Sequence, residues 1–173
     1  MVKKFDPAKL NLKDALDVAI FIEEDARSRY DDFVAQMDVH HTLDTAEFFR
    51  IMVVAETKHR DELTARRKTL FGDQPVTIDT SIVPEIEAPE YDKVRAFMTP
   101  RQALAIALQA EARAHDFYAA ALKKAKDRDV KKLFTELREE EIEHQNIVKR
   151  EIAKLTPEDP TRTEDYADEP NPQ

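Results

Sequence analysis

Two long stretches of this chain contain no proline. Residues 8–74 and 101–156 are free of it, although the chain has nine prolines in all. Proline inside a helix removes a backbone hydrogen bond and clashes with the preceding turn, so long helices are permitted in these two stretches. Glycine occurs once, at Gly72. One glycine cannot serve the tight turns of a β-sandwich or barrel, nor a phosphate-binding loop. We therefore expect an all-α fold.

Apolar residues recur at helical spacing in four segments. These segments cover roughly residues 12–38, 44–70, 100–126 and 129–154. Helices of about 25 residues would each be about 38 Å long. Short links join the first segment to the second and the third to the fourth, which predicts two antiparallel hairpins. The connection formed by residues 72–98 is long enough to cross from one end of the bundle to the other. We therefore expect residues 1–155 to form a single four-helix bundle.

Charge and composition narrow the choice of partners and location. The formal net charge is −9, which disfavours nucleic acid as a partner. No apolar run approaches the ~20 residues of a membrane span, and the first residues lack the apolar stretch of a signal peptide, so we expect a cytoplasmic protein with no membrane partner. The absence of cysteine excludes disulfides, thiolate zinc sites and iron–sulfur clusters. Residues 156–173 hold six acids and four prolines, and we expect this tail to be disordered.

Ionisable residues occupy positions where the helical stripes predict a core. They are Glu23, Glu56, His59, Glu111, Glu141 and His144. An unpaired buried carboxylate costs several kcal/mol, so the set requires a common cause. The two Glu-x-x-His motifs each place a carboxylate and an imidazole on one helix face. Each hairpin would contribute two glutamates and one histidine, and two divalent ions would neutralise the four carboxylates. Oxygen and imidazole ligands favour iron or manganese.

Residues 12–154 resemble the ferritin-like carboxylate di-iron superfamily, and within it the rubrerythrin-like branch. The stretch EEDARSRY, from Glu23 to Tyr30, is similar to the first-helix signature of rubrerythrins. The stretch EIEH, from Glu141 to His144, is similar to their fourth-helix motif. The resemblance implies a ferritin-like bundle that holds two iron ions, with manganese as a possible replacement.

The resemblance also implies a role for each candidate residue. Two carboxylates would bridge the metals, namely Glu56 and Glu141. Four residues would be terminal ligands: Glu23, Glu111, His59 and His144. Two tyrosines, Tyr30 and Tyr118, would lie beside the ligands, where they could hydrogen-bond a carboxylate or carry an electron. Three further residues are weaker candidates for contacting the ligands, namely Asp25, Asp61 and Arg113.

Two departures from the family pattern bear on activity. Peroxidase-type rubrerythrins carry another glutamate three residues after the third-helix ligand, and this chain has Ala114 there, followed by His115. Many also carry a cysteine-ligated rubredoxin domain, which a chain without cysteine cannot form. The resemblance therefore implies a non-haem di-iron peroxidase or oxidase that reduces peroxide or O₂ with electrons from Fe(II) or an external donor. It also implies a homodimer, in which the long connection of residues 72–98 could let two protomers exchange hairpins.

Other interpretations of the same residues remain open. The protein could be an iron-storage protein with slow ferroxidase activity, a manganese catalase, or a metal-free helical scaffold. Several charged residues fit an ordinary surface role: we expect this of Glu139, Glu140, Glu143, His40 and His41. His115 fits either a contact with the ligands or an ordinary boundary position.

Overall fold

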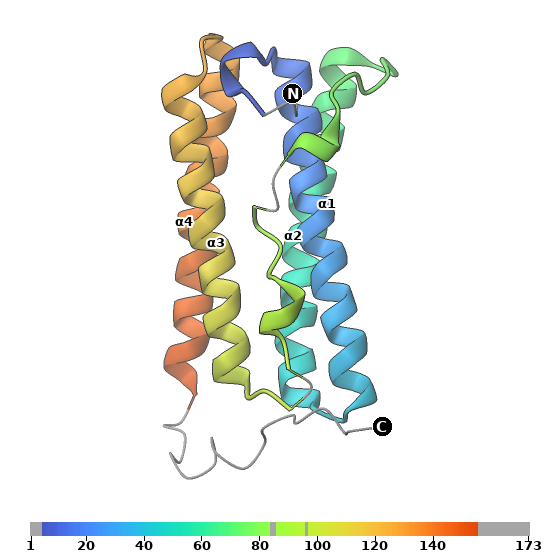
Figure 1. Ribbon diagram of the computed structural model, residues 1–173, viewed down its shortest axis with the longest axis vertical. Coiled ribbons are helices and arrows are strands. Elements are labelled where there is room, and N and C mark those ends of the chain that lie inside the picture. The colour runs from blue at the N-terminus through green and yellow to red at the C-terminus, as the bar shows by residue number, and fades with distance from the viewer. Residues whose placement is uncertain (1–4, 84–85, 96, 156–173) are drawn as a thin grey trace.

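A computed structural model describes residues 5–83, 86–95 and 97–155 of the chain. Its elements are η1 (Pro7–Lys9), α1 (Leu12–Val39), α2 (Leu43–Phe71), η2 (Thr80–Ile82), η3 (Tyr91–Lys93), α3 (Pro100–Lys124) and α4 (Arg128–Lys154). No strand occurs within the described ranges. The expected all-α, ferritin-like four-helix bundle is confirmed (Figure 1). The predicted disorder of residues 156–173 concerns a tail outside the described residues.

Local sequence signals fix the ends of these helices. Thr99 and Gln102 form a reciprocal capping box at the start of α3, where Pro100 occupies the first helical position. The side chain of Asp127 accepts hydrogen bonds from two backbone N–H groups in the first turn of α4. Gly72 ends α2 with φ of 58°, a left-handed value that glycine adopts without steric cost.

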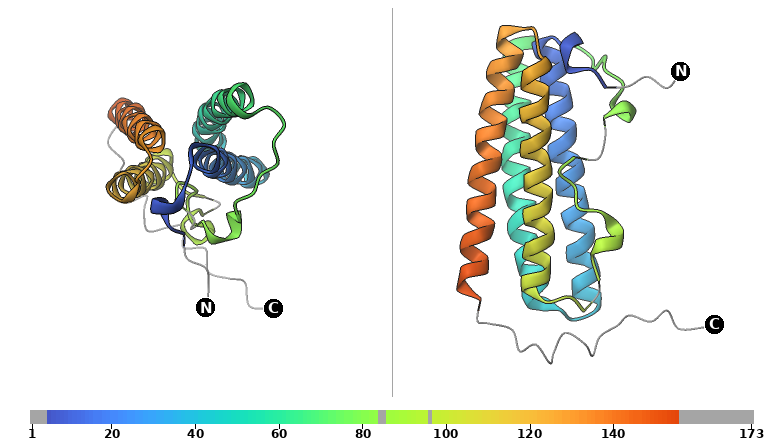
Figure 2. Two further views of the ribbon diagram at one scale, coloured as in Figure 1. Left: turned by 90° about the horizontal axis from the view of Figure 1, so that it is seen from above. Right: turned by 60° about the vertical axis from the view of Figure 1, so that its left-hand side comes forward.

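The helices pack as two antiparallel hairpins, α1 with α2 and α3 with α4. The crossover leaves α2 at one end of the bundle and reaches α3 at the other end (Figure 1). As a result α2 runs parallel to α3. The two views in Figure 2 place part of the crossover over the seam between α1 and α3. The crossover thus contacts one helix of each hairpin.

Two apolar clusters fill the bundle, and a layer of ionisable residues separates them. The first cluster includes Leu16, Ile22, Tyr118, Phe134 and Leu137. The second includes Ala26, Phe33, Phe49, Leu104 and Val148. On α1 the clusters meet between Ile22 and Ala26, where Glu23 lies. The equivalent gaps on the other helices hold the remaining predicted ligands, so the candidate site is enclosed by apolar packing on both sides.

Candidate metal centre

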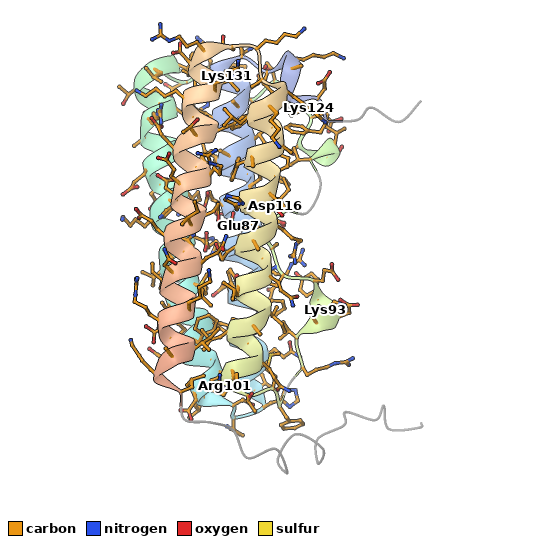
Figure 3. The ribbon with its side chains drawn as sticks, turned by 90° about the vertical axis from the view of Figure 1, so that its left-hand side faces the viewer. Glu87, Lys93, Arg101, Asp116, Lys124 and Lys131 are labelled. Atoms are coloured by element: carbon orange, nitrogen blue, oxygen red, sulfur yellow. The ribbon has the colours of Figure 1, made fainter. Side chains whose placement is uncertain are left out.

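Five glutamates and one histidine gather in the layer between the two apolar clusters. The glutamate side chains are almost fully buried, each residue being exposed by 2% or less: Glu23, Glu56, Glu87, Glu111 and Glu141. His144 is 6% exposed. Four of the glutamates come from the four helices, whereas Glu87 lies on the crossover. Figure 3 shows Glu87 about halfway along the bundle.

Their potential ligand atoms form two groups. The first group contains Glu56, Glu87, Glu111 and His144, and the second contains Glu23, Glu87 and Glu141. Within each group, one ligand atom from every residue lies within 4.8 Å of the others. This spacing lets each group surround one ion. Glu87 belongs to both groups, which places it between the two potential metal positions.

Protein hydrogen bonds satisfy only Glu111 completely. Its Oε2 lies 3.1 Å from Nδ1 of His144, and its Oε1 accepts a long hydrogen bond of 3.5 Å from the hydroxyl of Tyr30. The two contacts hold the carboxylate from opposite oxygens. Nδ1 is thus the nitrogen of His144 that faces the carboxylates, because Nε2 lies 3.3 Å from Nε2 of His59.

Six other carboxylate oxygens in the layer have no hydrogen-bond partner. Both oxygens of Glu56 and of Glu87 are buried without one, as are Oε2 of Glu23 and Oε2 of Glu141. Buried polar groups are normally paired, and leaving a buried charge unpaired is costly. Divalent cations would supply the missing partners for all six oxygens. The residues present therefore fit a carboxylate-bound metal pair.

Burial and mutual repulsion shift the protonation of the layer. Burial, followed by the charge of Glu87, raises the pKa values of Glu23, Glu56 and Glu141 well above the usual range. Burial, followed by the charge of Glu111, raises the pKa of Glu87 to about 8. Several acids that resist ionising together in one small volume indicate a site built to hold cations.

The two predicted histidine ligands lie side by side. Nε2 of His59 is 3.3 Å from Nε2 of His144, and the ring centroids are 4.5 Å apart. Burial, followed by the neighbouring His144, lowers the pKa of His59 to about 4, which keeps that imidazole neutral at pH 7. For His144, burial acts to lower the pKa, but the hydrogen bond and charge of Glu111 raise it overall. His59 joins neither compact group, but it contacts His144, which does.

Both predicted tyrosines are fully buried beside the carboxylates. Tyr30 donates to Glu111, whereas the hydroxyl of Tyr118 has no hydrogen-bond partner. Burial, followed by the charge of Glu111, raises the pKa of Tyr30. Burial, followed by the charge of Glu23, does the same for Tyr118. Both phenols therefore remain protonated donors at neutral pH.

The weaker candidates mostly lie away from the layer. Asp61 is exposed and pairs with Arg60 at 2.7 Å. His115 is half-buried, and its Nδ1 lies 3.1 Å from Oδ1 of the next residue, Asp116. Asp25 is half-buried and belongs to neither ligand group.

Four of the five charged residues expected at the surface are exposed, and Glu140 is the exception. His40, His41, Glu139 and Glu143 are exposed. Glu140 is half-buried, with Oε2 3.8 Å from Nδ1 of His59, and burial raises its pKa. Glu140 is therefore not a fully solvated residue, because its carboxylate lies beside the imidazole of His59.

Sequence reasoning missed Glu87. The crossover has no helical periodicity, so spacing could not assign this residue to the interior. A local signal did exist, since Glu87 stands between Ile86 and Ala88, both of which are buried. By contrast Ala114, three residues after Glu111, is fully buried and contributes only apolar packing. The additional carboxylate thus enters from the crossover and not from α3.

No helix in the described part of the chain is long and apolar enough to cross a membrane. The fold and the buried layer define the class of ferritin-like bundles with a carboxylate and histidine centre. Protein-family comparison is more specific: the Rubrerythrin model matches residues 14–152, and a second match covers residues 102–170. The chain belongs to the rubrerythrin family.

A solved structure is similar in fold. The chain is similar to an uncharacterized conserved protein from Magnetospirillum magnetotacticum MS-1, with 29% sequence identity and a TM-score of 0.67. The similarity covers 87% of this chain and 99% of the other. Comparison with the curated proteins gives no significant match.

Proposed function

We propose that this protein is a di-iron oxidoreductase of the rubrerythrin type, which reduces peroxide or O₂ with electrons from Fe(II) or from an external donor. The observation that carries the proposal is the set of six buried carboxylate oxygens without hydrogen-bond partners, arranged in two compact groups. A metal-free scaffold would have to bear the cost of burying them. Family membership supports iron as the ligand.

The proposed ligands are the six residues that the sequence indicated: Glu23, Glu56, His59, Glu111, Glu141 and His144. Five of them belong to one or other compact group, which supports their assignment. His59 is assigned because its neutral imidazole lies against His144 at the edge of the layer. We assign Glu56 and Glu141 as the bridging carboxylates from the family resemblance.

When bound, two ferrous ions supply the two electrons that reduce peroxide to water or O₂ to peroxide. The protein holds and shields them. Its apolar clusters lie on both sides of the layer and exclude bulk water, which strengthens electrostatic interactions inside. Tyr30 steadies Glu111 through its hydroxyl, and Glu111 in turn orients His144. The chain has no cysteine, so we assign reduction of the centre to a separate protein or small molecule.

Metal content provides the first test. We expect about two iron ions per chain in protein from iron-supplemented cells, and loss of most of this iron in a Glu56→Gln, Glu141→Gln double variant, because both lost carboxylates face the ions. A Glu139→Gln, Glu143→Gln double variant is the matched control, since both residues are exposed on α4. Equal metal content in all three proteins, or none in any, would contradict the proposal.

Reaction kinetics separate an oxidoreductase from a storage protein. In stopped-flow mixing of the Fe(II)-loaded protein, oxidation by peroxide or O₂ should be faster than oxidation of free Fe(II) and should repeat when a reductant is supplied. One slow oxidation followed by retained iron would indicate storage. Two manganese ions per chain with peroxide dismutation would indicate a catalase.

We also propose a homodimer, and a monomer by light scattering would exclude both the dimer and a hairpin swap through residues 72–98.

A further inference from the structure

We propose that Glu87 is an additional protein ligand of the metal centre, contributed by the crossover and placed to serve both metal positions. The inference rests on the proposed metal-binding function and goes beyond it, because the helices alone supply the ligand set described above. Glu87 is the one residue of the described chain that belongs to both compact ligand groups.

The carboxylate of Glu87 is buried without a hydrogen-bond partner. The residue is 1% exposed, and neither carboxylate oxygen has a hydrogen-bond partner. Residues on a crossover that follows the bundle surface can readily point into solvent. A glutamate that instead points into an acidic interior adds to the repulsion there. A positive ligand shared with the other carboxylates accounts for this placement.

Arg113 of α3 fixes the backbone on both sides of Glu87. Its Nε donates to the carbonyl oxygen of Ile86 at 3.3 Å, and its Nη2 donates to that of Ala88 at 3.1 Å. The guanidinium group therefore spans Glu87 and binds the peptide groups that flank it. Such a clamp fixes the position of the side chain between them, which is what a ligand residue on an irregular segment requires.

Arg29 of α1 fixes the same segment from the other hairpin. Its Nη1 donates to the carbonyl oxygen of Pro89 at 2.8 Å, a buried hydrogen bond. Its guanidinium also stacks over the ring of Tyr91 at 3.9 Å, and the Tyr91 hydroxyl donates to Asp32 at 2.6 Å. The segment is thus held at both hairpins while the carboxylate of Glu87 stays free of hydrogen bonds. If Glu87 served only to fasten the crossover, we would expect it to be paired.

The test is Mn(II) binding to metal-free, full-length protein, followed by isothermal titration calorimetry and electron paramagnetic resonance. We compare the wild type with Glu87→Gln, which keeps the shape but removes the charge. At least one of the two wild-type binding events should weaken by about tenfold or more in Glu87→Gln, as expected for loss of a group that holds a metal. Glu90→Gln is the matched control, because Glu90 lies on the same crossover with its side chain 54% exposed.

A second variant guards against misfolding. Glu87→Asp keeps a buried charge but withdraws it by one methylene, so it should also weaken Mn(II) binding while Glu90→Gln binds as wild type does. Circular dichroism of the metal-free proteins checks that each variant is folded. Two Mn(II) ions bound at wild-type affinity by either folded Glu87 variant would overturn this proposal alone. A wild type that binds no metal would instead contradict the proposed function.

Discussion

Buried acids in this protein are satisfied in two different ways. Asp17 of α1 is 5% exposed and is paired with Lys13 at 2.8 Å and with Arg67 at 2.6 Å. Glu56 is fully buried, and neither of its oxygens has a partner. The chain therefore can neutralise a buried carboxylate with a basic side chain, and in the middle layer His144 pairs with Glu111, yet Glu56 and Glu87 have no such partner. This contrast is the residue-scale reason for assigning the layer to cations.

The stability of the metal-free protein should depend on pH through these residues. Burial raises the pKa of Glu87 from the usual 4.5 to about 8, so between those values the folded chain binds more protons than the unfolded chain. Through Glu87, stability falls as pH rises through this interval, whereas His59, whose pKa is lowered from 6.5 to about 4, acts in the opposite direction over the lower part of it. In the presence of a chelator, thermal melting should occur at a higher temperature near about pH 5 than near about pH 8.

Metal should reverse this trend, since ions compete with protons for the same oxygens. The melting temperature of the Mn(II)-loaded protein should therefore rise with pH over the same interval. Glu87→Gln should flatten the slope measured in chelator, because it removes one of the titrating groups. A chelated wild type that gained stability with rising pH would contradict the burial of un-neutralised acids.

At the scale of the elements, the sequence was sufficient to locate the four helices. Every helix end lies within two residues of the position expected from the helical spacing of apolar residues. The crossover offered no such regularity, since its conformation depends on side chains of α1 and α3 that are distant in sequence. Arg29 and Arg113 determine where this segment lies. The position of Glu87 is consequently a tertiary property that periodicity could not predict.

The start of α3 provides a prediction about a single element. The hydroxyl of Thr99 accepts from the backbone N–H of Gln102, and the Gln102 side chain accepts from the backbone N–H of Thr99. Thr99→Ala should lower the free energy of unfolding by about 1 kcal/mol, because it leaves an N-terminal backbone donor unpaired. Thr135→Ala is the control: this threonine is inside α4, where alanine is the better helix former, so chemical denaturation should show no loss. Equal losses in both would contradict the capping argument.

At the scale of the whole molecule, the ligand layer lies between two apolar clusters that belong to both hairpins. The sequence predicted this layer because each helix carries a glutamate in its apolar stripe and two carry a histidine three residues later. It could not predict that His59 would contact His144 without joining either compact group, because rotation of α2 about its axis is set by packing. Spacing identifies the face of a helix but not the depth of a side chain.

The two arginine contacts of the crossover have a consequence for rates. Arg29 belongs to the first hairpin and Arg113 to the second, and both hold the segment that carries Glu87. We propose that an ion bound by Glu87 leaves when this segment lifts, so the rate of metal transfer to a chelator should not exceed the rate at which the segment opens. Hydrogen exchange at the amides of Glu87 and Ala88 measures that opening. Bound metal should slow it, and Arg113→Ala should accelerate both exchange and metal release by similar factors.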